Sequence, residues 1–124
     1  MISMIKFIDA NIFIEPWNNP SAYEFVDNLH RDAHCTSVLV LSEVYHKLMK
    51  KNVTRVFEHI RYIMGAIKVY DFTQEDLFHA MKNNLDISIN DKIHLAVMKR
   101  NSIATIISFD RGFDKDKTII REEP

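Results

Sequence analysis

The sequence predicts a single α/β domain, residues 1–124, in which helices cover both faces of a mainly parallel sheet. Short apolar runs typical of strands alternate along the chain with segments whose apolar residues have helical spacing. Glycine and proline are scarce, with 2 and 3 among 124 residues, so long unstructured linkers are not expected. A chain of this length buries enough apolar surface for a core without disulfides. The expected fold class is a three-layer α/β/α domain.

The N-terminal part is expected to form a strand, a loop and a helix. Residues 4–8 are apolar except for Lys6, which is typical of a strand buried on both faces. A loop at residues 15–19 follows. Asn19 before Pro20 indicates a helix start, because asparagine caps helices and proline fits their first turn. The apolar face of this helix consists of Ala22, Phe25, Val26 and Leu29.

The middle of the chain is expected to form an extended segment, 33–37, and two helices. Ser37 is placed to cap the first helix. The apolar positions of this helix are Leu41, Val44, Tyr45 and Leu48. Asn52 is expected to cap the second helix, and Gly65 to end it. The apolar face of the second helix comprises Val53, Val56, Phe57, Ile60, Ile63 and Met64.

The C-terminal half is expected to contain three strands and two helices. Residues 67–72 alternate like a strand, residues 104–109 form an apolar strand, and residues 118–120 form a last short one. Thr73 and Asp76 have the spacing of a capping box. The helix that they open has the apolar positions Leu77, Ala80 and Met81. The same cap spacing recurs at Ser88 and Asp91, before Ile93, Ala96 and Val97.

Charge and cysteine content limit the class of protein. The net charge of −1, with 27% charged residues, excludes a globally basic nucleic-acid coat, so any contact with nucleic acid would use a local patch. Cys35 is the only cysteine, which excludes an intramolecular disulfide. The sequence shows no signal peptide and no apolar stretch of the ~20 residues that span a bilayer. We therefore expect a cytoplasmic protein without a membrane segment.

Four carboxylates are expected to meet at one edge of the sheet. Asp9 and Asp110 follow two of the apolar strands, and Glu43 and Asp91 lie near the starts of two helices. In a parallel sheet, strand ends and the starts of the following helices share one edge, where ligands bind. Converging carboxylates repel each other and lose hydration, which a divalent cation relieves. Oxygen ligands without a cysteine or histidine pair at zinc spacing favour Mg²⁺ or Mn²⁺.

Asn11 and Ser37 are expected to support this cation site. Their side chains can orient the carboxylates or the waters that the cation holds. A cation bound there would lower the pKa of a bound water and stabilise charge on a phosphoryl oxygen. Asp9 would then be a metal ligand held by a rigid strand.

Four segments together resemble the PIN-domain family, and most of all its VapC-type ribonuclease toxins. The segments are FIDANIFI (7–14), TSVLVLSEVYHKL (36–48), INDKIHLAVMKRN (89–101) and IISFDRGFDK (106–115). They occur in the family's order and span nearly the whole chain. The resemblance implies an Mg²⁺- or Mn²⁺-dependent endoribonuclease whose catalytic and metal-binding acids are Asp9, Glu43, Asp91 and Asp110, with Asp114 accessory. It also implies a homodimer and a cognate antitoxin protein.

Each of these acids also has a plainer interpretation when it is taken alone. Asp91 can be only a capping-box residue, and Glu43 can be plain surface beside an apolar helix face. Asp110 also fits a turn, and Asp114 is more typical of surface than of catalysis. His94, on a mostly apolar helix, is more typical of a satisfied core histidine than of a metal ligand.

Two surfaces are expected to serve partners. Lys47, Lys50 and Lys51 follow Glu43 and are placed to hold RNA phosphates, although a solvated helix face fits them equally. An antitoxin is expected to insert a basic side chain, such as arginine, among the acids. Its apolar part is expected to dock on Trp17, Val53, Val56 and Phe57.

Other functional classes fit the sequence less well or remain open. Asp9-Ala10-Asn11 is similar to the start of haloacid-dehalogenase phosphatases, which need a second aspartate at the position of Asn11. A response-regulator receiver would need an acidic pair at the first strand and an aspartate on a middle strand, which the sequence lacks. A housekeeping PIN nuclease of RNA processing and a PIN-like scaffold that binds RNA or protein without cutting both remain open.

Overall fold

The computed structural model describes residues 4–124 and has a central sheet of five parallel strands in the order β3-β2-β1-β4-β5. The strands are β1 (Lys6–Ile8), β2 (His34–Ser37), β3 (Lys68–Tyr70), β4 (Thr105–Ile107) and β5 (Ile120–Glu122). Phe7 of β1 lies opposite Cys35 of β2 on one side and Ile106 of β4 on the other. The chain builds the sheet outward from β1 in one direction and from β4 in the other. The strand order therefore reverses between β1 and β4.

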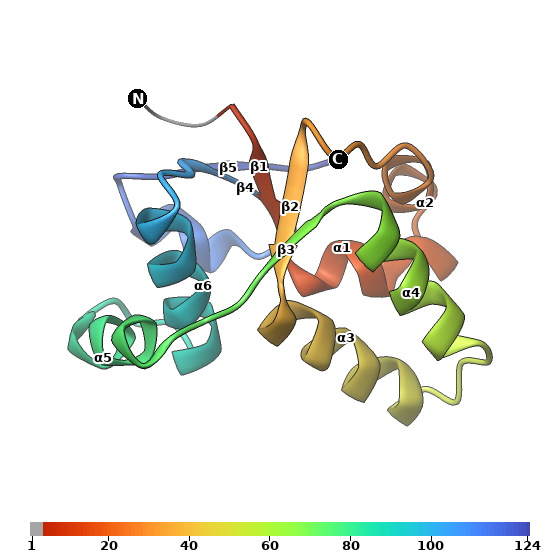
Figure 1. Ribbon diagram of the computed structural model, residues 1–124, viewed down its shortest axis with the longest axis horizontal. Helices are drawn as coiled ribbons and strands as arrows, with labels where there is room; N and C mark the ends of the chain where they lie inside the picture. Colours follow the sequence, from red (N-terminus) through yellow and green to blue (C-terminus); the bar gives the residue numbers. More distant parts are fainter. Residues whose placement is uncertain (1–3) are drawn as a thin grey trace.

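Helices cover both faces of this sheet, as Figure 1 shows. One face carries α1 (Ala10–Ile14), α2 (Pro20–Asp27), α3 (Val38–Lys50) and α4 (Val56–Ala66), and the other carries α5 (Gln74–Lys82) and α6 (Ile89–Arg100). Two short 3₁₀ helices, η1 (Glu15–Trp17) and η2 (Arg111–Lys115), follow α1 and β4. The predicted three-layer α/β/α fold is confirmed. Within residues 4–124, every helix falls short of the length and apolarity that a membrane span needs.

The core is built around the two central strands. Phe7, Ile8 and Ile106 are fully buried and belong to one apolar cluster with Leu48 of α3 and Met98 of α6. Burying an apolar side chain of this size contributes about 1.5–3 kcal/mol. The strands that end at the candidate site are therefore anchored by the most deeply buried part of the molecule.

Four of the five predicted helix caps are confirmed by their hydrogen bonds. The side chain of Asn19 accepts from the backbone N–H groups of the first turn of α2, and Ser37 accepts from that of Val40 in α3. Thr73 and Asp76 form the expected reciprocal capping box at α5. Ser88 accepts from the backbone N–H of Asp91 at the start of α6. Local polar residues therefore determine where these helices begin.

Several predicted boundaries are wrong. Asn52 caps no helix, because Asn52 and Arg55 adopt positive φ angles of 57° and 61°, and α4 begins only at Val56. Gly65 lies inside α4, which continues to Ala66. Residues 10–14 form a helix that was not predicted, and residues 15–17 are a 3₁₀ helix, not a loop. The last strand lies at residues 120–122, two residues later than predicted.

Some residues expected on buried helix faces are exposed. They are Tyr45, Phe57, Met64, Leu77 and Met81. Each lies at helical spacing from buried residues of its own helix, but a neighbouring element covers only one stripe of that helix. The spacing of apolar residues predicted these helices, but it assigned too many residues to their buried faces.

Candidate active site

Asp9 lies at the junction between β1 and α1, which explains a carboxylate inside an apolar run. The strand ends at Ile8, and Asp9 caps the helix that begins at Ala10 by accepting the backbone N–H of Ala10 at Oδ1 over 2.8 Å. Asp9 is only 5% exposed. Burial raises the pKa of its carboxyl above the usual range.

Two polar side chains hold the other oxygen of Asp9. The hydroxyl of Ser108, which is fully buried after β4, donates to Oδ2 of Asp9 over 2.7 Å, and Nδ2 of Asn11 donates to the same oxygen over 3.2 Å. Oδ1 of Asn11 accepts the backbone N–H of Phe109. Oγ of Ser108 also accepts the backbone N–H of Asp110 over 2.9 Å. This network joins the ends of β1 and β4 and fixes the orientation of the Asp9 carboxyl.

Asp91 enters the site from the first turn of α6. Its backbone is fixed by Ser88, and its half-buried carboxyl comes close enough to Asp9 and Asp110 to be affected by their charges. Burial, followed by the charge of Asp9 and then that of Asp110, raises the pKa of Asp91 to about 6 from an ordinary value of 3.8. Asp9 and Asp91 thus form a pair of carboxyls that resist ionising together.

Asp110 is exposed at the rim of this group. It caps η2, with Oδ1 accepting the backbone N–H of Gly112 over 2.8 Å. A Cβ atom at position 112 would stand 3.0 Å from that same oxygen. The absence of a side chain on Gly112 therefore leaves room for the carboxylate of Asp110.

Glu43 reaches the site from α3 and is held by two residues of α6. Its Oε1 accepts from Nε2 of His94 over 2.8 Å, and its Oε2 accepts from Nδ2 of Asn90 over 3.4 Å. Burial acts to raise the pKa of Glu43, but the hydrogen bond and the charge of His94, followed by the hydrogen bond from Asn90 and the charge of Lys47, keep the pKa below its usual value. Nε2 of His94 also lies 3.9 Å from Oδ1 of Asp9. His94 therefore lies between the two carboxylates.

The inner part of this cluster has the composition of a cation site. Asp9, Asp91 and His94 each offer a ligand atom, and these atoms lie within 4.8 Å of one another. The two carboxyls have raised pKa values, so a cation would offset the cost of ionising them. A donor set dominated by carboxylate oxygens suits a hard divalent cation.

Other predicted site residues lie outside this group. Asp114 is 52% exposed at its side chain and pairs with Arg121 over 3.0 Å, and its accessory role stays a prediction. Ser37 is fully buried and acts on the backbone of α3, the helix that carries Glu43. The lysines Lys47, Lys50 and Lys51 are exposed on α3 and just beyond it.

The sequence did not predict the contacts of Ser108 with Asp9, or those of Asn90 and His94 with Glu43. Ser108 stands two residues before Asp110, just as Asp9 stands two residues before Asn11. The same spacing of two polar residues after an apolar strand could have indicated that Ser108 belongs to the site. His94 follows Asp91 by three residues, which places both on one face of a helix. The expectation of a satisfied core histidine is half right, because Nδ1 has no hydrogen-bond partner in the described part of the chain.

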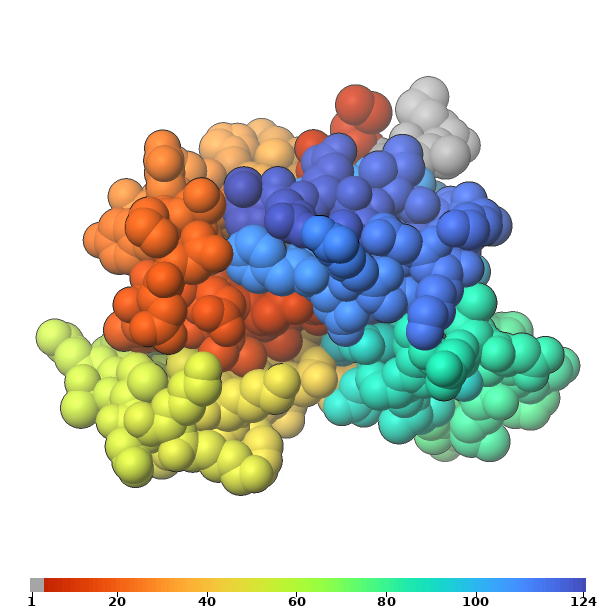
Figure 2. Space-filling view, turned by 180° about the vertical axis from the view of Figure 1, so that it is seen from behind, coloured from red at the N-terminus to blue at the C-terminus, as the bar shows by residue number. Residues whose placement is uncertain are grey.

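The cluster lies where the strand order of the sheet reverses. Asp9 follows β1 and Asp110 follows β4, while Glu43 and Asp91 come from helices on opposite faces of the sheet. Figure 1 shows α3 and α6 diverging from this edge, and Figure 2 shows the surface hollowed between the α3–α4 lobe and the α5–α6 lobe. Ligands of open parallel sheets bind at such a point.

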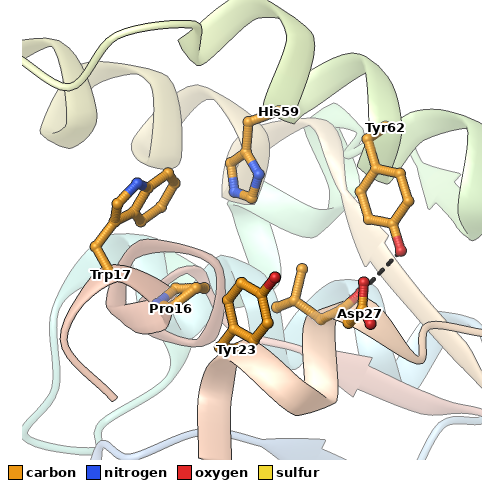
Figure 3. A pocket seen from close by; sticks show the side chains of 7 residues that line it. Pro16, Trp17, Tyr23, Asp27, His59 and Tyr62 are labelled. Carbon is orange, nitrogen blue, oxygen red and sulfur yellow. Dashed lines mark hydrogen bonds between the residues drawn. The ribbon is translucent and has the colours of Figure 1, made fainter. Parts of the chain in front are cut away.

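An aromatic groove of about 480 Å³ lies apart from the acids, between η1 and α2 on one side and α4 on the other (Figure 3). It is lined by Pro16, Trp17, Tyr23, Val26, Asp27, His59 and Tyr62. Nε2 of His59 lies 3.1 Å from the backbone oxygen of Phe13, and the hydroxyl of Tyr62 donates to the backbone oxygen of Val26 over 2.9 Å. These bonds hold α4 to the opposite wall.

The four residues predicted to receive a partner lie at different depths, and Val53 is partly buried against the core. Trp17 lines the aromatic groove and is half exposed. Val56 is buried in the core, at 4% exposure, and cannot contact a partner. Phe57 is exposed but does not line the groove.

Comparison with known families decides the class of this domain. The family described as "PIN domain" matches residues 6–117, which is most of the chain. The chain belongs to the PIN-domain family. No curated protein sequence shows a significant match to this PIN domain.

Solved structures with the same fold include toxins and toxin–antitoxin complexes. VapC20 of Mycobacterium tuberculosis, described as a sarcin-ricin loop cleaving toxin, has 18% identity and a TM-score of 0.78, covering 95% of this PIN domain and 98% of that chain. VapBC-1 of nontypeable Haemophilus influenzae has 17% identity and a TM-score of 0.74, covering 97% and 98%. VapBC2 of Rickettsia felis, bound to a promoter DNA fragment, has 19% identity and a TM-score of 0.71, again covering 97% and 98%.

Proposed function

We propose that this PIN domain is a metal-dependent endoribonuclease and the toxin of a type II toxin–antitoxin pair. The observation that carries the proposal is the convergence of Asp9 and Asp91, two carboxyls with raised pKa values, beside Glu43 and Asp110. Carboxyls whose pKa values are raised by burial and by neighbouring charge are typical of functional sites. Similarity of fold to VapC20 and to the VapBC complexes supports the toxin role.

The four acids would hold Mg²⁺ or Mn²⁺, and the surrounding residues would fix their positions. When bound, the cation supplies a water acidic enough to attack near neutral pH and stabilises charge on a phosphoryl oxygen. Ser108 and Asn11 hold one oxygen of Asp9. Ser37 fixes the first turn of α3 and, through it, the position of Glu43. The chain thus presents its acids in place before a cation arrives.

The RNA backbone would be held next to these acids. Lys47, Lys50 and Lys51 give the exposed side of α3 three positive charges, close enough for Lys47 to act on the carboxylate of Glu43. Phosphate contacts of this kind position a nucleic acid and are weakened by salt. We expect the triple replacement of these lysines by glutamine to raise KM more than it lowers kcat.

Cleavage of labelled single-stranded RNA with Mg²⁺ or Mn²⁺, and with EDTA, tests the activity. Asp9→Asn keeps the shape of the side chain and removes its charge, so cleavage should fall by at least about a hundredfold while the fold persists. The matched control is Asp32→Asn, a carboxylate 92% exposed in the segment before β2, which should cut like the wild type. Equal activity of the Asp9 variant would overturn the metal-site assignment. Metal binding without cleavage would favour a non-catalytic scaffold.

An antitoxin would inhibit the nuclease by covering two places at once. A basic side chain would pair with Asp9, Glu43, Asp91 and Asp110 and compete with the cation. Arginine suits this role because its planar guanidinium can bind a carboxylate through two hydrogen bonds. An apolar segment would lie in the aromatic groove, where Trp17 and Tyr23 expose about half or more of their surface. Aromatic side chains in a groove are the usual anchors of such binding.

Co-purification with the product of the neighbouring gene tests the antitoxin. The complex should form, should cut RNA more slowly than the free chain, and should be weakened about tenfold or more by Trp17→Ala. Phe57→Ala is the control, because Phe57 is exposed outside the groove. A complex that cuts as fast as the free chain would exclude inhibition at the site. If no neighbour binds and RNA is still cut, a housekeeping nuclease is the better proposal.

A homodimer is part of the same proposal. Leu77, Phe78 and Met81 form an exposed apolar group on α5, at 40%, 55% and 64% exposure. Groups of this kind often mark an interface. Light scattering should give the mass of a dimer, and Met81→Lys should shift it toward the monomer.

A further inference from the structure

We infer that His94 is a positioning residue, which holds the carboxylate of Glu43 beside Asp9 through an Nε2–H donor and does not itself bind the cation. This inference rests on the proposed metal site and concerns how that site is held. His94 lies on α6 and Glu43 on α3, so the pair joins helices from opposite faces of the sheet.

The burial of His94 shows that it is not there for stability alone. Its side chain is fully buried, and its ring packs on that of Phe7 with the centroids 5.8 Å apart. Nδ1 has no hydrogen-bond partner within residues 4–124. A buried polar atom without a partner costs free energy, so an apolar residue of similar volume would suit the core better. What the imidazole adds at this position is its Nε2 atom.

The distances indicate what Nε2 does. Glu43 Oε1 lies 2.8 Å away, which is a hydrogen bond, while Asp9 Oδ1 lies 3.9 Å away, which is not. A carboxylate only accepts, so Nε2 must carry the proton in this bond. A nitrogen that carries a proton has no lone pair for a cation. While Nε2 donates to Glu43, the same atom is not free to coordinate a cation.

Glu43 would not be left without a partner if His94 were replaced. The glutamate side chain is 22% exposed, so water can replace His94 as its partner. Loss of His94 would therefore release the orientation of Glu43 more than it would change stability.

Two variants separate this role from a structural one. His94→Gln can place an amide N–H near the position of Nε2, whereas His94→Leu fills the space without a donor. Mn²⁺ titration calorimetry should give an affinity for the glutamine variant within about threefold of the wild type and a loss of about tenfold or more for the leucine variant. Urea denaturation should show both variants folded. Equal affinities for the wild type and the leucine variant would overturn the inference.

Two spectroscopic readouts complete the test. In metal-free protein, ¹⁵N chemical shifts of His94 should show the proton on Nε2, and Glu43→Leu should weaken this preference. A proton on Nδ1 would overturn the inference whether or not the protein is a nuclease.

In the Mn²⁺ complex, electron spin echo modulation should show no coordinated imidazole nitrogen. A coordinated nitrogen that disappears in His94→Gln would make His94 a ligand instead. Absence of Mn²⁺ binding by the wild type would end the proposed metal site, separately from the tautomer result.

Discussion

The hydroxyl of Ser108 donates a hydrogen bond of 2.7 Å to Oδ2 of Asp9 and so ties the end of β4 to the end of β1. Both residues are buried, and the same hydroxyl accepts the backbone N–H of Asp110. One side chain thus fixes an acid on each of the two central strand ends. The geometry of the acidic cluster depends on this bond as much as on the acids themselves.

Ser108→Ala is expected to reduce both stability and metal affinity. The change removes one of the two donors to Oδ2 of Asp9 and the acceptor for the N–H of Asp110, which should lower the free energy of unfolding by about 1–3 kcal/mol. Mn²⁺ affinity should fall by about tenfold. Urea denaturation and calorimetry measure these effects. Ser21→Ala, at an exposed position of α2, is the control and should change neither quantity.

Much of the fold was predictable because its determinants are local. Thr73 and Asp76 form their capping box within one turn, and Ser37 needs only the backbone of Val40. The apolar strands were recognisable because both of their faces are buried. The errors fall where the conformation depends on packing between distant segments. The positive φ angles of Asn52 and Arg55 do not follow from the spacing of apolar residues. Nor does the exposure of Phe57 beside the buried Val56.

The acids of the site were predictable for a different reason. Asp9 and Asp110 follow strands and Asp91 opens a helix, so the topology of a parallel sheet brings them to one edge. The part of His94 was not predictable, because its partner Glu43 lies 51 residues away on a helix of the opposite face. Only the meeting of α3 and α6 near the strand ends makes them neighbours.

Asp91→Asn is expected to stabilise the metal-free protein at neutral pH. The pKa of Asp91 is raised to about 6 in the folded state, so the unionised form is favoured there and ionisation at pH 7 opposes folding. As the pH falls through 6 toward 3.8, the folded wild type takes up its proton first and gains stability, which the variant cannot do.

Melting temperatures in EDTA between pH 4 and pH 8 measure this effect. The variant should exceed the wild type at pH 7, and the difference should vanish near pH 4. Added Mn²⁺ should reverse the order at pH 7, because mass action stabilises only the chain that binds the ion. A variant less stable than the wild type at pH 7 in EDTA would contradict the placement of Asp91 beside Asp9.

Asp76→Ala is expected to destabilise the fold without affecting the site. Asp76 closes the capping box of α5 and accepts Nε of Arg100 over 3.0 Å and Nη2 over 3.0 Å, which joins α5 to α6. Burial acts to raise the pKa of Asp76, but the hydrogen bonds from Arg100 and Thr73 lower it. Its contribution is therefore complete above pH 3.8 and is lost as the pH falls through the lowered pKa.

The unfolding free energy at pH 7 should fall by about 1–3 kcal/mol in Asp76→Ala. Arg100→Lys should lower the unfolding free energy by less, since lysine keeps the positive charge and loses only the bidentate hydrogen bonding to Asp76. Mn²⁺ affinity should stay within about twofold of the wild type in both variants. An affinity that fell with stability would mean that the α5–α6 contact also sets the position of Asp91.

The two glycines of the chain give opposite predictions when each is replaced by alanine. At Gly65, inside α4, a Cβ atom would meet nothing within 4 Å, so Gly65→Ala should stabilise the protein by about 0.5–1 kcal/mol through the helix preference of alanine. At Gly112 the Cβ atom would stand 3.0 Å from Oδ1 of Asp110 and 3.4 Å from a methyl carbon of Ile87. Gly112→Ala should therefore push the carboxylate of Asp110 out of its hydrogen bond with the backbone of residue 112.

Thermal denaturation and Mn²⁺ calorimetry on both variants separate the two effects. Gly65→Ala should raise the melting temperature and leave the affinity unchanged. Gly112→Ala should lower the affinity by about tenfold with little change in the metal-free melting temperature, because Asp110 is exposed at the rim of the site. Unchanged affinity in Gly112→Ala would show that Asp110 contributes nothing through this geometry, and the metal would then belong to Asp9, Asp91 and Glu43 alone.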